Sequence, residues 1–306
     1  MFSRRFLRIK AMQSVYGHLQ DAFESVEKTE KALLDALNNS YQLYVYNLYI
    51  LTEIVKYVED EQERLKTNYL EHEDDVLISD KLLNSSIIQY FIEDAQLEAI
   101  FKKEKMKEIV DDKGIVDAYH QLKKSEQWKV FISNEDSTED DAFDVLKFLY
   151  YDIVLQHEFL EQHLEEEYIS WQDDREFVAS CVVKTMKSIS KGKSSMLVPF
   201  QGNWKEDASF IKELIKGSIY DYEEVDEMIK PYIKNWEIER ITMIDRLLIH
   251  MAICEFMNID SVPSRVSLDE YLELAKLYST PKSKTFINGV LDRVLKDLVK
   301  AGKAKA

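Results

Sequence analysis

The sequence predicts an all-α protein, and three observations support this prediction. Only 7 glycines and 4 prolines occur in 306 residues, which leaves few positions for the tight turns that join strands. Apolar residues recur at spacings of three and four along most of the chain, as they do in amphipathic helices. Hydrophobic residues make up 45% of the chain, enough for the core of one large or two smaller domains. We therefore expect helices joined by short polar loops.

The first helix is expected from about Arg5 to Gln20. On a helix, Arg4, Arg5 and Arg8 fall within an arc of roughly 100°, on the side that farther along carries apolar residues. The first turn is therefore expected to project beyond the core. Arginines at a helix N-terminus oppose the helix dipole at a cost of about 0.3 to 1 kcal/mol each. They would be better placed beside an anion, and the alternative is a basic helix end covered by solvent alone.

Helical spacing continues through residues 27–69, where tyrosines alternate with leucine and isoleucine. No lysine or arginine lies between Tyr41 and Leu51, so these tyrosines are assigned to packing and not to RNA stacking. Asn84 or Ser85 is expected to cap a helix that continues to Phe101. A single long helix is predicted over residues 141–167, and another over residues 175–189.

The last hundred residues predict helices at about 242–258, 268–277 and from 281 onward. Thr242, Ser267 and Thr280 are the expected N-caps, and Pro281 suits the first position of its helix. Gly289 lies inside the last helix, where glycine costs about 1 kcal/mol relative to alanine. A close approach of another helix is the expected reason for this glycine.

The net charge of -17 predicts a surface that repels polyanions and attracts basic proteins, so any nucleic-acid contact must be local. Cys181 and Cys254 are far apart and are expected to be buried free thiols in a reducing cytoplasm. No uncharged run of about 18 apolar residues occurs, so no membrane contact is expected.

Motifs for catalysis and metal binding are missing from the sequence. His157-Glu158-Phe-Leu-Glu161 lacks the second histidine of a zinc helix, and no glycine-rich nucleotide loop or nucleophile motif occurs. We therefore expect no metal, no cofactor and no enzymatic activity.

Several segments together carry a resemblance to a known family. The opening Arg4-Arg5-Phe-Leu-Arg8-Ile-Lys10-Ala11-Met-Gln13-Ser-Val-Tyr16 is followed by Lys230-Pro231-Tyr232, Ile244-Asp245-Arg246, Ala252-Ile-Cys-Glu255, Val262-Pro263, Asp269-Glu270 and Phe286-Ile-Asn-Gly-Val-Leu-Asp292. In this order and spacing, these segments closely resemble the NusB family of bacterial transcription antitermination factors.

The resemblance implies a NusB-like helical bundle of two packed helical subdomains with an additional inserted helical region. Residues 1–20 would form its arginine-rich first helix, 21–205 the inserted region, 206–300 the C-terminal helical domain and 301–306 a disordered tail.

The resemblance also implies a function in the cytoplasm. NusB-like proteins bind single-stranded boxA RNA of ribosomal RNA transcripts together with a small-subunit ribosomal protein called NusE, in a complex with transcribing RNA polymerase. The implied RNA-binding residues are Arg4, Arg5, Arg8, Lys10, Gln13, Tyr16, Tyr232, His250, Lys282 and Phe286. Asp245 would face the ribosomal protein. His250 stands where the family often has arginine, and Lys282 replaces a common acidic residue.

Two other interpretations stay open. The chain could be a helical protein-interaction scaffold that has lost RNA binding, with the inserted region as its binding surface. It could also be the accessory domain of an RNA methyltransferase, since NusB-like domains precede some such enzymes, although no glycine-rich cofactor loop is present.

Overall fold

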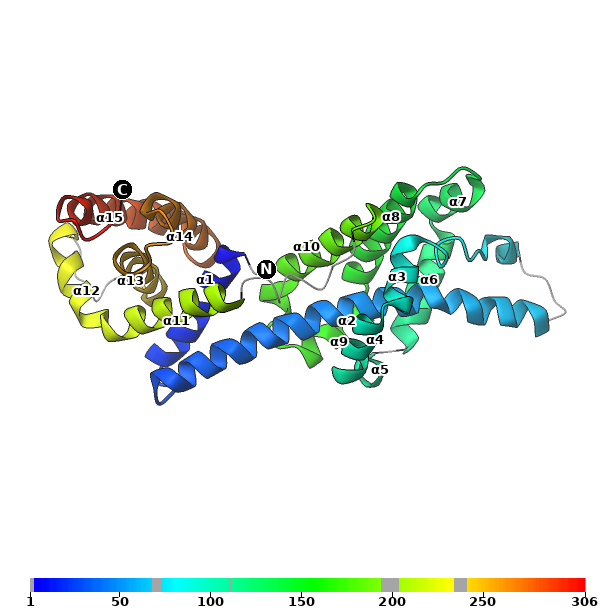
Figure 1. The fold of residues 1–306 in the computed structure, drawn as a ribbon, viewed down its shortest axis with the longest axis horizontal. Coiled ribbons are helices and arrows are strands. Elements are labelled where there is room, and N and C mark those ends of the chain that lie inside the picture. The colour runs from blue at the N-terminus through cyan, green and yellow to red at the C-terminus, as the bar shows by residue number, and fades with distance from the viewer. Residues whose placement is uncertain (1–2, 68–72, 111, 194–203, 234–240, 306) are drawn as a thin grey trace. The chain divides into compact units, whose positions relative to one another are not determined.

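The computed structural model describes residues 3–67, 73–110, 112–193, 204–233 and 241–305. Within these residues every regular element is a helix and no strand occurs, which confirms the predicted all-α class. The chain divides into two compact units (Figure 1): unit 1 comprises Met1–Leu37 and Gln201–Ala306, and unit 2 comprises Asn38–Phe200. The described residues include no helix long and apolar enough to cross a membrane.

Unit 1 is built around one buried helix. Its elements are α1 (Arg4–Leu19), the start of α2 (Val26–Thr67), α11 (Trp204–Tyr220), α12 (Tyr222–Ile229), the 3-10 turn η5 (Lys230–Tyr232), α13 (Met243–Asn258), α14 (Ser264–Tyr278) and α15 (Pro281–Lys300). Helix α13 contacts α1, α11, α12, α14 and α15 and lies among them (Figure 1). A helix enclosed in this way is apolar on nearly every side, and every residue from Leu247 to Phe256 is buried.

Unit 2 holds the rest of α2 and most of the short helices. These are η1 (Glu73–Leu77), α3 (Ser86–Glu93), α4 (Ala95–Lys103), α5 (Met106–Ile109), α6 (Asp112–Lys124), α7 (Glu126–Ser133), α8 (Glu139–Phe148), η2 (Leu149–Ile153), η3 (Val154–Gln156), α9 (Glu158–Glu167) and α10 (Trp171–Ser190). Tyr44 and Tyr46 of α2 are fully buried in the core of this unit, so their assignment to packing is confirmed.

The single long helix predicted over residues 141–167 is wrong. After α8 the backbone passes through the π-helical turn η2 and the 3-10 turn η3, and α9 begins after the extended residue His157. Arg175 explains part of this break, because its guanidinium donates to the Leu155 carbonyl and to Glu161 Oε1, the latter at 2.6 Å. Because the Arg175 side chain satisfies the Leu155 carbonyl, this carbonyl does not need a backbone hydrogen bond within a helix.

Several predicted helix starts are confirmed. Ser85, Thr242 and Thr280 each accept a hydrogen bond from a backbone N–H in the first turn of their helix. Ser267 is not an N-cap, because α14 already begins at Ser264. Both cysteines are buried free thiols, as predicted.

Candidate nucleic-acid interface

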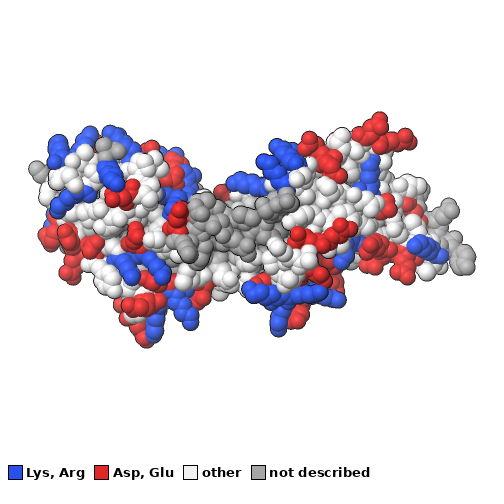
Figure 2. Space-filling view, in the orientation of Figure 1, with Lys and Arg blue, Asp and Glu red and all other residues white. Residues whose placement is uncertain are grey.

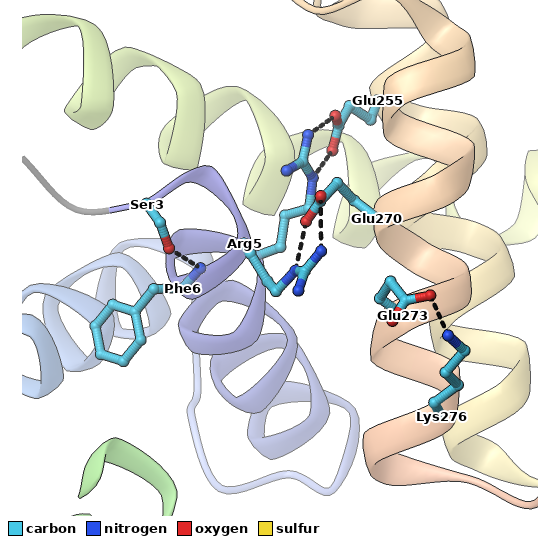
Figure 3. Close-up of polar contacts among 8 residues, drawn as sticks. Ser3, Arg5, Phe6, Glu255, Glu270, Glu273 and Lys276 are labelled. Carbon is cyan, nitrogen blue, oxygen red and sulfur yellow. Dashed lines mark hydrogen bonds and ion pairs between the residues drawn. The ribbon is translucent and has the colours of Figure 1, made fainter. Parts of the chain in front are cut away.

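The first turn of α1 sets where its arginines lie. Ser3 caps the helix by accepting a hydrogen bond from the Phe6 N–H at 3.1 Å (Figure 3). Phe6 and Leu7 are buried and fix the helix against unit 1. The register that buries them decides which arginine faces solvent and which faces the core.

Arg5 is the most exposed of the three arginines, with 46% of its side chain accessible. It forms a bidentate pair with Glu270 of α14, Nε to Oε2 at 2.8 Å and Nη2 to Oε1 at 3.0 Å (Figure 3). The hydrogen bond from Arg5 lowers the pKa of Glu270, and the bond to Glu270 raises the pKa of Arg5. Both groups are therefore charged, and Arg5 reaches solvent already paired with an anion.

Arg8 lies inside unit 1, with only 1% of its surface exposed. It donates to both carboxylate oxygens of Glu255 on α13, with Nε 2.8 Å from Oε2. Ser267 and Tyr271 donate to the same carboxylate at 2.5 and 3.0 Å. This burial counts against the implied contact of Arg8 with phosphate, which stays a prediction.

Arg4 lies between these two cases. Its guanidinium carbon is 4.3 Å from the centroid of the Phe210 ring, and Nη1 is 3.9 Å from Oδ1 of the buried Asp207. The second distance is too long for a hydrogen bond, and burial raises the pKa of Asp207. Arg4 is thus held more by its contact with the Phe210 ring than by the Asp207 carboxylate.

A groove of about 350 Å³ lies beside these arginines. Its lining residues are Ser3, Arg4, Arg5, Arg8, Val262, Val266 and Glu270. Val266 is half exposed, so the groove offers apolar surface next to cationic groups.

A second group of cations lies at the end of α14 and the start of α15. Lys276 donates to Glu273 at 2.5 Å (Figure 3), and this bond raises the pKa of Lys276. The neighbouring Lys276 side chain lowers the pKa of Lys284. Lys282 is exposed in the same first turn of α15, where the helix dipole adds positive potential.

The remaining implied RNA-binding residues differ in accessibility. Tyr16 is exposed, whereas Gln13 and Phe286 are partly buried. Tyr232 is also partly buried and donates to Asp297 of α15 at 2.8 Å. Lys10 is buried, with Nζ 5.4 Å from the centroid of the Phe6 ring, and this burial counts against its implied contact with RNA.

His250 and Asp245 are both interior residues of α13. His250 is completely buried, Nε2 lies 2.8 Å from Asp226 Oδ1, and burial lowers its pKa to about 4. Asp245 accepts a hydrogen bond from the Ser279 hydroxyl and is 5% exposed. Their implied contacts with RNA and the ribosomal protein stay predictions, and the burial of both side chains counts against them.

Sequence reasoning overlooked the residues that pair with the arginines. Glu255, Glu270 and Phe210 were not assigned to the site, and neither were Lys276 and Lys284. Glu270 lies 265 positions from Arg5, and no local pattern indicates which acid meets which arginine. Glu255 and Glu270 do occur in the segments that resemble the family. Their negative charge, opposite to that of the arginines, was the one available sign that they pair with them.

Comparison with known proteins finds similar sequences for part of the chain. A family model described as the NusB family matches residues 199–296. The transcription antitermination protein NusB of Salinibacter ruber is 47% identical over 94 residues, which cover 31% of this chain and 59% of that protein. The protein of the same name from Clostridium botulinum is 44% identical over 89 residues, which cover 29% of this chain and 62% of that protein. The NusB protein of Listeria monocytogenes is 39% identical over 89 residues, which cover 29% of this chain and 70% of that protein.

The chain belongs to the NusB family. The similarity to NusB proteins concerns about a third of the chain, and the chain spans about 60% of the length of the first two relatives. The matched NusB segment includes α11 to α14 and most of α15, which supply Phe210, Glu255, Glu270, Lys276 and Lys284. No solved structure matches the chain.

Proposed function

We propose that unit 1 binds boxA-like single-stranded RNA of ribosomal RNA transcripts, together with the small-subunit ribosomal protein NusE, and acts in antitermination within a transcribing RNA polymerase complex. The observation that carries the RNA proposal is a basic track, which we define as Arg4, Arg5, Lys276, Lys282 and Lys284. Arg4 and Arg5 line one groove. Lys276 lies in the last turn of α14, and Lys282 and Lys284 lie in the first turn of α15, the next helix along the chain. Such a track follows a phosphate backbone.

Accessible aromatic side chains on α1 and α15 support binding of a single strand over a duplex. Tyr16 is exposed and Phe286 is partly exposed, and stacking of an unpaired base on an aromatic ring contributes about 1 to 3 kcal/mol. Because the whole chain carries a net charge of -17, attraction of RNA must come from this local track.

Glu270 gives the site a built-in competitor. A phosphate that binds Arg5 in bidentate fashion must replace the carboxylate that already occupies Nε and Nη2. Guanidinium groups pair with carboxylate and phosphate in the same fork geometry, so the exchange needs little movement of Arg5. The net affinity from Arg5 is then the difference between the two pairings.

The test is a salt titration of RNA binding with Arg4→Ala combined with Arg5→Ala. Each lost phosphate contact should reduce the slope of log affinity against log salt by about 0.7 for a single strand, and two contacts by about 1.4. Arg8 is left in place, because its removal would strand the buried Glu255 charge at a cost of about 3 to 5 kcal/mol.

The matched control is Lys102→Ala combined with Lys103→Ala on α4, which removes the same charge from exposed positions of unit 2. This control should keep the slope of the unmodified chain. An equal slope for all three proteins would contradict the proposal.

The scaffold interpretation rests on a different observation. Arg5 and Arg8 already hold carboxylates, which is the arrangement expected if arginine serves the fold and not a ligand. In that case the inserted region would bind a protein partner, and the chain would show no salt-dependent affinity for boxA-like RNA in the same titration.

A further inference from the structure

A groove in unit 2 has the character of a peptide-docking site. It lies between α7 and α8 and has a volume of about 390 Å³. The residues that line it are Glu126, Gln127, Val130, Phe131, Asn134, Ser137, Asp141, Asp144 and Val145.

The floor of the groove is apolar and accessible. Phe131 and Val145 form part of the buried core, but Val130 is 66% exposed. Trp128 explains this orientation, because its ring is buried and its indole N–H donates to the Leu77 carbonyl at 2.8 Å. With that face of α7 fixed inward, Val130 must point outward, where covering it would be favourable.

The rim of the groove is acidic. Among the described lining residues, Glu126, Asp141 and Asp144 carry negative charge and none is basic. Two lysines lie against the lining, because Lys129 pairs with Glu126 at 2.8 Å and Lys81 donates to the Phe131 and Asn134 carbonyls. Residues 135–144 contain six acidic residues and no basic one, and Figure 2 shows acidic side chains gathered over the connection between α7 and α8 at the upper right.

One acidic residue of the rim, Asp141, is held in place by hydrogen bonds. Asp141 accepts hydrogen bonds from the Thr138 backbone N–H and hydroxyl, both at 2.7 Å, and these bonds lower its pKa. Its charge is therefore fixed at the start of α8 by a capping box.

We propose that this groove binds a short basic segment of another protein, in which lysines or arginines flank a large apolar anchor residue that covers Val130. The charge of the rim is complementary to such a segment and opposed to a nucleic acid. A second copy of this acidic chain would bring further negative charge. This partner site lies in unit 2 and goes beyond the RNA site proposed for unit 1.

The experiment uses the full chain and a fluorescent synthetic peptide with leucine and phenylalanine at helical spacing among lysines. Binding is measured by anisotropy over a range of salt concentrations. Val130→Glu should weaken binding at least about tenfold, as expected for loss of a central apolar contact. Asp144→Lys should weaken binding most at low salt, because a rim charge acts mainly through screened attraction.

Two matched controls separate the groove from general attraction to an acidic protein. Ile169→Glu places the same charge on a fully exposed apolar residue outside the groove, and Glu63→Lys repeats the charge change on an exposed part of α2. Both variants should bind the peptide like the unmodified chain. Equal weakening by Val130→Glu and Ile169→Glu, or no weakening by Val130→Glu, would overturn the proposal. So would a dimer, detected by light scattering, that Val130→Glu dissociates, because the occupant would then be a second copy.

Discussion

The three arginines of α1 meet three different environments within two helical turns. Arg8 pairs with Glu255 in the core, Arg5 pairs with Glu270 at the surface, and Arg4 lies against the Phe210 ring. Helical spacing predicted that the three arginines share one arc of the helix, but it could not predict how deeply each side chain is buried. Depth depends on α13 and α14, which come from the other end of the sequence and cover one side of that arc.

His250 provides a test of electrostatics inside α13. Its ring is enclosed by Asp226 and Tyr222, with Arg246 bound to the same Asp226 carboxylate. Burial is the main cause that lowers its pKa to about 4, whereas an unfolded chain has a histidine pKa of about 6.5. As pH falls, the unfolded state takes up the proton first, so stability present above about pH 6.5 should be lost progressively toward pH 4.

The measurement is the free energy of unfolding in urea at several pH values across that window. His250→Gln removes the titrating group and should flatten the decline, whatever its effect on stability at neutral pH. Parallel curves for the two proteins would show that other groups dominate the acid dependence.

At the scale of single elements, most predicted N-caps were confirmed, with Ser267 the exception, and the helix breaks were not predicted. Thr242 and Thr280 act within three residues of themselves, so their role is visible in local sequence. The break after α8 depends on Arg175 reaching Leu155 across 20 positions. The break between α3 and α4 falls at Asp94, which caps α4, and the continuous apolar spacing across it concealed this local signal.

Two glycines of unit 1 give a matched prediction about helix packing. The expected close approach at Gly289 is wrong, since a Cβ there would meet no described atom nearer than the Arg293 guanidinium at 4.0 Å. Gly289→Ala should therefore stabilise the protein by about 0.5 to 1 kcal/mol, through the higher helix propensity of alanine. Thermal unfolding of the variant should show a raised midpoint.

Gly217 of α11 is the contrasting position. A Cβ there would lie 2.9 Å from Asn258 Nδ2 and 3.4 Å from Cys254 Cβ. Gly217→Ala should destabilise the protein, by about 1 to 3 kcal/mol if the packing against α13 cannot relax. A Gly289→Ala variant that is less stable than the unmodified chain would show that some contact at α15 needs the glycine.

At the scale of the whole molecule, the sequence located the family region but not the limits of the compact units. The motifs end near Tyr16 and resume near Lys230, so the expected boundaries were set by where resemblance stops. In the structure α2 runs without interruption across the limit at Leu37. A helix of 42 residues contains no local signal that its first three turns pack in one unit and the remainder in another.

The division into units predicts a division of ligands that hydrogen exchange can measure. The basic track belongs to unit 1, and the acidic groove between α7 and α8 belongs to unit 2. A boxA-like RNA should therefore slow exchange around residues 3–16, near Tyr232 and at 276–289. It should leave residues 41–67 and 126–145 unchanged, because phosphates are repelled by the acidic rim. The lysine-rich peptide should give the opposite pattern, with slowing concentrated at 126–145. RNA protection located mainly in unit 2 would mean that this unit binds the nucleic acid, and the assignments of Arg4, Arg5, Lys276, Lys282 and Lys284 would have to be withdrawn.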